Sequence, residues 1–130
     1  MASRGVVNRL GFITDVEYKN TGNDFGNASE IIGIGTNHSL PDYSHSGPNR
    51  IYVKTDSNGF RAMRVYGDNG KAKLEIAYHP ERNLKPNGAN VLHYHLFDEN
   101  LVRTRAAFLT DELYEQYRQY LNHWGIYFNE

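Results

Sequence analysis

Two histidines lie two residues apart within an apolar run in the last third of the chain. The stretch ANVLHYHLFDEN covers residues 89–100, and His93 and His95 alternate there with leucine and tyrosine. This alternation has the two-residue period of a β-strand, so both imidazoles leave the same face of a sheet. Two imidazoles on one face suit either acid–base chemistry or the binding of a metal ion.

A third histidine, His79, ends the alternating run KLEIAYH at residues 73–79. It reaches the same face as the pair if these two strands are neighbours. The predicted catalytic set is therefore His79, His93 and His95, with one imidazole as base and another as acid. Cations and phenols on this face would bind the substrate, and the candidates are Lys54, Arg64, Lys73, Tyr52 and Tyr66. Such groups suit RNA cleavage by internal attack of the 2′-hydroxyl, with no cofactor.

The metal interpretation uses the same three histidines with Glu99 as a further ligand. A glutamate that follows a His-x-His pair by four residues is similar to the first motif of cupins. Neither the glycine expected after the acid nor a second histidine motif follows in the chain. Metal binding by His79, His93, His95 and Glu99 is therefore the second choice.

Four alternating runs between residues 50 and 97 predict an antiparallel meander. The stretches DSNGF and GDNGK separate the first three of these runs and have the composition of hairpin turns. A two-residue turn at Asn69-Gly70 would place Arg64 opposite Glu75 and apolar side chains opposite each other. For the preceding hairpin, a three-residue loop over residues 57–59 would place Val53 opposite Met63.

These registers divide the sheet into two faces. The apolar face is predicted to form the core and contains Ile51, Val53, Met63, Val65, Leu74, Ile76, Tyr78, Leu92, Tyr94 and Leu96. The other face is predicted to be polar and contains Arg50, Tyr52, Lys54, Arg64, Tyr66, Lys73, Glu75, His79, His93 and His95.

A C-terminal helix over residues 110–124 is predicted to cover the apolar face. Thr110 is a suitable N-cap, acidic residues follow it, and Gly125 is placed to end the helix. An apolar stripe has helical spacing and consists of Leu113, Tyr117, Tyr120, Leu121 and Trp124. The expected fold class is α+β, an antiparallel sheet of four or more strands with this helix on one face.

Length and composition predict a single domain over residues 1–130, in which residues 1–49 are expected to be irregular. The chain has 14 basic and 15 acidic residues, which disfavours a globally basic nucleic-acid binder but allows a local basic patch. It contains no cysteine, so disulfides and thiolate zinc sites are excluded. No apolar run reaches membrane-span length, and the N-terminal residues lack the hydrophobic block of a signal peptide, so no membrane partner is expected.

The stretch RVYGDNGKAKLEIAYHPE followed by VLHYHLFDEN resembles the C-terminal domains of bacterial polymorphic toxins and phage head-associated proteins. These domains are grouped with the barnase, EndoU, colicin and RelE-like ribonucleases. The resemblance covers residues 64–100. It implies a curved antiparallel sheet, RNA as the substrate, His79, His93 and His95 at the site, and Arg64 as a phosphate contact. It also implies a bacterial or phage origin, action in the cytoplasm, and a cognate immunity or inhibitor protein as a partner.

The sequence therefore predicts a small metal-independent endoribonuclease that uses histidine acid–base chemistry. The alternatives are a non-catalytic phage or interaction module and a three-histidine metal-binding domain.

Overall fold

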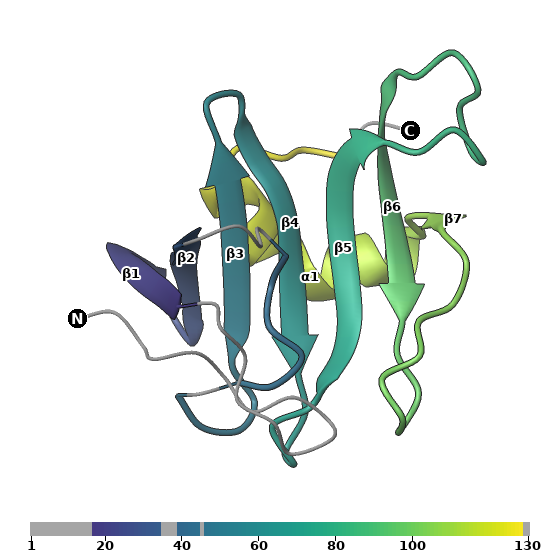
Figure 1. Ribbon diagram of the computed structural model, residues 1–130. Helices are drawn as coiled ribbons and strands as arrows, with labels where there is room; N and C mark the ends of the chain where they lie inside the picture. The colour runs from purple at the N-terminus through teal and green to yellow at the C-terminus, as the bar shows by residue number, and fades with distance from the viewer. Residues whose placement is uncertain (1–16, 35–38, 45, 129–130) are drawn as a thin grey trace.

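A computed structural model describes residues 17–34, 39–44 and 46–128 of the protein. Within these residues, one sheet contains seven strands in chain order, and one helix lies across one of its faces (Figure 1). The elements are β1 (Glu17–Phe25), β2 (Ala28–Ile34), β3 (Ile51–Asp56), β4 (Gly59–Tyr66), β5 (Ala72–Pro80), β6 (Asn90–Leu96), β7 (Ala107–Phe108) and α1 (Asp111–His123). Neighbouring strands are antiparallel except β2 and β3, which are parallel. The predicted α+β class, a meander with a C-terminal helix, is confirmed.

The predicted strand registers are confirmed in the centre of the sheet. Arg64 lies opposite Glu75 between β4 and β5, and Val53 lies opposite Met63 between β3 and β4. The turn between β3 and β4 differs from the expected three-residue loop, because Gly59 already pairs with Asp56. The register then shifts between Lys54 and Thr55. This bulge produces the strand offset that the sequence analysis attributes to a longer loop, so the pairing in the centre of β3 and β4 is the predicted one.

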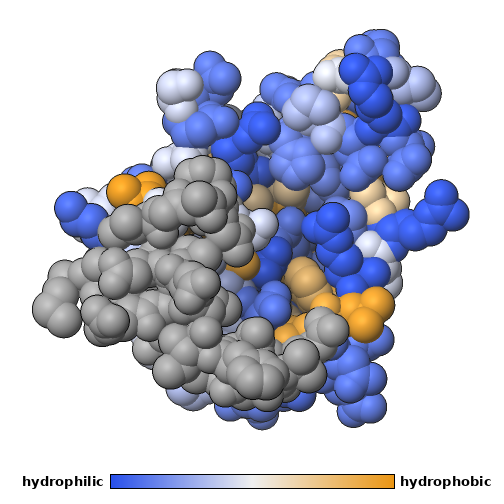
Figure 2. Space-filling view, in the orientation of Figure 1, coloured by the Kyte–Doolittle hydropathy of each residue, from blue (hydrophilic) through white to orange (hydrophobic). Residues whose placement is uncertain are grey.

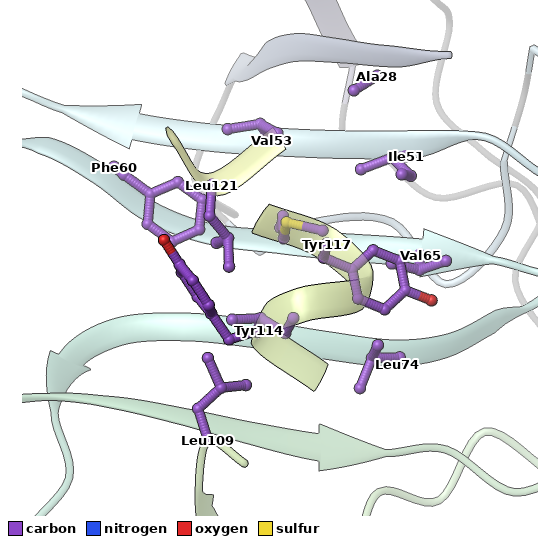
Figure 3. Packing of buried hydrophobic residues seen from close by; sticks show 12 residues of the cluster. Ala28, Ile51, Val53, Phe60, Val65, Leu74, Leu109, Tyr114, Tyr117 and Leu121 are labelled. Atoms are coloured by element: carbon purple, nitrogen blue, oxygen red, sulfur yellow. The ribbon is translucent and has the colours of Figure 1, made fainter. Parts of the chain in front are cut away.

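The apolar face of the sheet packs against α1, as the two-residue and helical periods predict. Side chains of α1 and the sheet meet in one buried cluster (Figure 3). The sheet contributes Ile51, Val53, Met63, Val65, Leu74 and Ile76, and the helix contributes Tyr114, Tyr117 and Leu121. Tyr114 was absent from the predicted stripe, whereas Tyr78 and Leu96, predicted as core, are exposed near the strand ends.

Thr110 caps α1 as predicted, because its side-chain oxygen accepts a hydrogen bond from the Leu113 backbone N–H at 3.1 Å. The Thr110→Ala variant is expected to lose about 1 kcal/mol of unfolding free energy, since this N–H then loses its acceptor. Urea denaturation measures the loss. Thr110→Ser keeps a hydroxyl and should retain most of the stability, so equal losses in both variants would contradict the capping role.

Much of the opposite face of the sheet is also buried, which differs from the solvated polar face that the sequence suggested. A second apolar cluster covers it and consists of Tyr18, Ile31, Leu40, Tyr52, Ala62, Tyr66, Ala72, Ala77 and Leu101. Figure 2 looks onto this side, where the coloured surface around the grey residues is mainly hydrophilic. Among the polar side chains of this face, Arg64, Glu75, His93 and His95 are buried, whereas Lys73 is exposed.

The expectation that residues 1–49 are irregular is wrong for residues 17–34, which form β1 and β2. Several residues typical of turns, Asn20, Gly22 and Asn23, lie within β1, where the register shifts between Asn20 and Asp24. The tip of this hairpin contacts the end of α1, since Phe25 stacks on His123 with ring centroids 4.6 Å apart. Residues 1–16 lie outside the described part. Among the described residues, no helix combines the length and apolarity needed to span a membrane.

Candidate functional site

The three histidines meet on one face of β5 and β6. His93 lies opposite Ala77 and His79 lies opposite Val91, so the side chains of His79, His93 and His95 leave the same side of the sheet. The ring centroids of His79 and His93 are 4.8 Å apart, and those of His93 and His95 are 5.5 Å apart. The predicted convergence of the three imidazoles is confirmed, whereas their chemistry stays a prediction.

Each of these imidazoles is oriented by a backbone carbonyl. The Nδ1 atoms of His93 and His95 lie 2.8 Å from the carbonyl oxygens of Val91 and Thr104, and His79 Nδ1 lies 2.9 Å from that of Pro80. A carbonyl oxygen can only accept a hydrogen bond, so each Nδ1 carries the hydrogen. In the neutral ring, Nε2 then has a free lone pair. All three imidazoles are thus prepared to accept a proton or bind a cation through Nε2.

His93 is the most deeply buried member, with 0% of its surface exposed. Its Nε2 atom has no hydrogen-bond partner among the described residues. Burial lowers the pKa of His93 from its ordinary value, and the neighbouring imidazoles of His79 and His95 act in the same direction, opposed by the Val91 carbonyl and by Glu81. The folded protein therefore keeps this ring neutral near physiological pH.

The lowered pKa of His93 predicts a loss of stability in mild acid. Above the unfolded-state pKa of 6.5 both states hold a neutral ring. As the pH falls below that value, the unfolded chain takes up the proton first, so the free energy of unfolding decreases. Thermal or urea denaturation from about pH 7.5 to 5 should show a shallower decrease for His93→Gln than for the wild type. His123→Gln serves as the exposed control, and an unchanged slope in His93→Gln would contradict this prediction.

Glu81 completes the cluster, and the sequence reasoning missed it. One carboxylate oxygen of Glu81 and one ring nitrogen each of His93 and His95 lie within 4.8 Å of one another. Glu81 directly follows β5 and begins a turn, in which its backbone oxygen accepts from the N–H groups of Leu84 and Lys85. This turn brings the carboxylate back to the histidine face. The signal in the sequence was the YHPE step, where a proline ends the strand one residue before an acid.

Glu99, the predicted fourth metal ligand, lies elsewhere. It lines a separate hollow with Asp68, Lys71 and Asp98, and its backbone oxygen accepts a hydrogen bond from Lys71 Nζ at 3.0 Å. The predicted set of His79, His93, His95 and Glu99 is therefore corrected. Within the described part of the chain, the groups close enough to share an ion are Glu81, His93 and His95.

A hollow of about 330 Å³ lies beside the cluster, and we call it the cationic hollow. Its charged and titratable lining consists of Lys54, Arg61, Arg64, Arg103, Glu75 and His79. Four cationic side chains thus face a single carboxylate, with an imidazole at the same surface. Burial lowers the pKa of the Lys54 ammonium, an effect that nearby Glu75 opposes. This part of the molecule has the charge expected of an anion site.

Arg64, predicted to contact phosphate, is engaged within the protein. Its Nε donates to Glu75 at 2.8 Å, its Nη1 donates to the Leu40 carbonyl at 2.8 Å, and its plane lies over the Phe97 ring. The side chain is 8% exposed. This placement does not support the predicted role, since its donors already have acceptors.

Three further substrate contacts are also not supported by their placement. Tyr52 and Tyr66 are buried, and the Tyr66 hydroxyl donates to the Pro41 carbonyl. Lys73 is exposed but lines the hollow near Glu99. Of the five predicted substrate contacts, only Lys54 combines a place in the cationic hollow with the absence of an ion pair to any described residue.

Comparison of the chain with protein-family models, curated protein sequences and solved structures finds no match. The relation to toxin-type ribonucleases therefore remains a prediction from the residue pattern of residues 64–100. The function must be inferred from the site itself.

Proposed function

We propose that the protein is a small endoribonuclease that binds an RNA phosphate in the cationic hollow and uses His79 as the reacting imidazole. The observation that carries this proposal is the lining of the hollow, where lysine and arginine side chains surround a space that His79 also reaches. The resemblance of residues 64–100 to toxin-type ribonucleases supports the same reaction class.

Three cations of the hollow differ in how fully they are neutralised. Arg61 Nε lies 3.1 Å from Asp56, and Arg103 Nη1 lies 4.0 Å from Glu75 with more than half of its side chain exposed. Lys54 has no ion pair with any described residue. A half-buried ammonium without a counter-ion favours an anionic ligand, because its charge is only partly solvated. Lys54 is therefore the principal phosphate contact in this proposal.

The reaction needs one base and one acid. His79 Nε2 takes the proton of the 2′-hydroxyl, and the 2′-oxygen attacks the adjacent phosphorus. The bond to the 5′-oxygen breaks, and that oxygen leaves with a proton from the Lys54 ammonium, whose pKa burial has lowered. The products are a 2′,3′-cyclic phosphate and a 5′-hydroxyl, and Arg61 and Arg103 of the hollow stabilise the developing negative charge.

His93 and His95 have a different role from the one first expected. Both are buried, so neither contacts RNA in this arrangement. The His93 ring packs nearly perpendicular to the His79 ring and supports it in this position. We therefore assign His79 as the catalytic residue and His93 as a positioning residue.

Incubation of the full chain with tRNA and total RNA in EDTA tests the proposal directly. Cleavage products that end in cyclic phosphate are expected, and circular dichroism on the same sample establishes that the protein is folded. Intact RNA across the neutral pH range, with the protein folded, would overturn the proposal.

A further inference from the structure

We infer that Glu81, His93 and His95 form a binding site for one divalent first-row transition-metal ion. The site joins two imidazole nitrogens and one carboxylate oxygen, whose ligand atoms lie within 4.8 Å of one another. This inference does not depend on the proposed cleavage of RNA.

The rings of His93 and His95 are both oriented for a cation. His93 and His95 each donate Nδ1–H to a backbone carbonyl at 2.8 Å, so the free lone pair of each is on Nε2. Metal-binding histidines in proteins almost always have such a partner on the second nitrogen, because it fixes the tautomer and the ring plane. The carbonyls of Val91 and Thr104 thus fix both rings in the tautomer whose Nε2 lone pair can bind a cation.

His93 has a buried ring nitrogen that an ion would satisfy. Its Nε2 has no hydrogen-bond partner among the described residues and lies in a side chain that is 0% exposed. A buried polar atom without a partner is costly, and buried polar groups are usually paired. A metal ion held between His93, His95 and Glu81 would satisfy it.

The Glu81 carboxylate is held by the turn in which it lies. The Asn83 backbone N–H donates to Glu81 Oε2 at 3.3 Å, and the turn after β5 holds the backbone of Glu81. The other carboxylate oxygen has no hydrogen bond to the described residues. Two imidazoles and one carboxylate suit Zn²⁺ or Fe²⁺ and leave further coordination positions open, whereas Mg²⁺ and Ca²⁺ prefer all-oxygen sites.

Titration of the metal-free full chain with Zn²⁺ and with Co²⁺ near pH 7.5 tests the inference. We expect one equivalent to bind, with a rise in the melting temperature and visible Co²⁺ absorption bands, while Mg²⁺ has no effect. Calorimetry gives the affinity. A wild-type protein that shows neither a change in melting temperature nor a Co²⁺ spectrum would overturn the inference.

Two matched pairs of variants test the assignment of the ligands. Glu81→Gln should weaken Zn²⁺ binding about tenfold or more, whereas Glu99→Gln, at the glutamate that follows the His-x-His pair by four residues, should leave it unchanged. His95→Ala should likewise weaken binding and His123→Ala should not. Glu81 lies in a turn at the surface, so its variant can be tested even if His95→Ala does not fold. Equal affinities of Glu81→Gln and Glu99→Gln would overturn the site. Because these measurements contain no RNA, their outcome is independent of the nuclease proposal.

Discussion

Replacement of His79 by alanine is expected to lower the rate of RNA cleavage roughly a hundredfold to ten-thousandfold, the range that a general base contributes. His79 is the one member of the histidine cluster that lines the cationic hollow, so in the proposed reaction it is the group that accepts the 2′-hydroxyl proton. Single-turnover cleavage of an end-labelled RNA measures the rate. Because the side chain is only half-buried and lies near the end of β5, its removal should change the melting temperature little.

The matched control for this variant is His123→Ala. His123 ends α1 and hydrogen-bonds to Asn23 through Nε2, on the opposite side of the sheet from the cationic hollow. Its loss should leave the cleavage rate at the wild-type value. A His79→Ala protein that is folded and as active as the His123→Ala protein would refute the assignment of His79 as the base.

The sheet was predictable because its determinants are local. Cross-strand pairs such as Arg64 with Glu75 are decided by a short turn and by the alternation of charge and apolarity in two adjacent runs. The same holds for α1, whose N-cap and apolar stripe lie within one short segment. In β1 the composition was misleading, because Asn and Gly are accommodated at an irregular step of the strand and the hairpin gains contacts with α1 from the far end of the chain.

The burial of the polar face could not be predicted from periodicity. Its cover includes Leu40, Pro41 and Leu101, which come from segments with no regular pattern and lie far from β4 and β5 in sequence. Alternation tells which side chains share a face, but not whether that face meets solvent. The pattern alone therefore predicts Arg64 as a substrate contact, whereas its guanidinium is buried and hydrogen-bonded to Glu75.

The histidine site was predicted in part for a related reason. His79, His93 and His95 are on adjacent strands, so their side of the sheet follows from strand register. The choice of acid depends on the path of a turn. Glu99 is nearer to the His-x-His pair in the sequence, but Glu81 is nearer in space because the chain folds back directly after Pro80.

The largest stability effect is expected at the buried ion pair of Arg64 and Glu75. Arg64→Met would leave the Glu75 carboxylate, whose side chain is 9% exposed, without its main counter-ion. Breaking a buried pair on one side costs about 3–5 kcal/mol, because an unpaired charge remains in a poorly solvated place. Urea denaturation of the two proteins, compared through the midpoint and the slope, measures this loss.

Arg61→Met is the matched control, since Arg61 also has a carboxylate partner, Asp56 at 3.1 Å, but the pair is partly exposed. Its loss should cost less than about 1 kcal/mol, because water screens and solvates the remaining charge. The double variant Arg64→Met/Glu75→Leu should recover part of the stability lost in Arg64→Met, since it removes the stranded carboxylate as well. If Arg64→Met were as stable as Arg61→Met but defective in binding RNA, Arg64 would be a phosphate contact. Its hydrogen bonds to Glu75 and to the carbonyls of residues 40 and 41 would then contribute little to the stability of the fold.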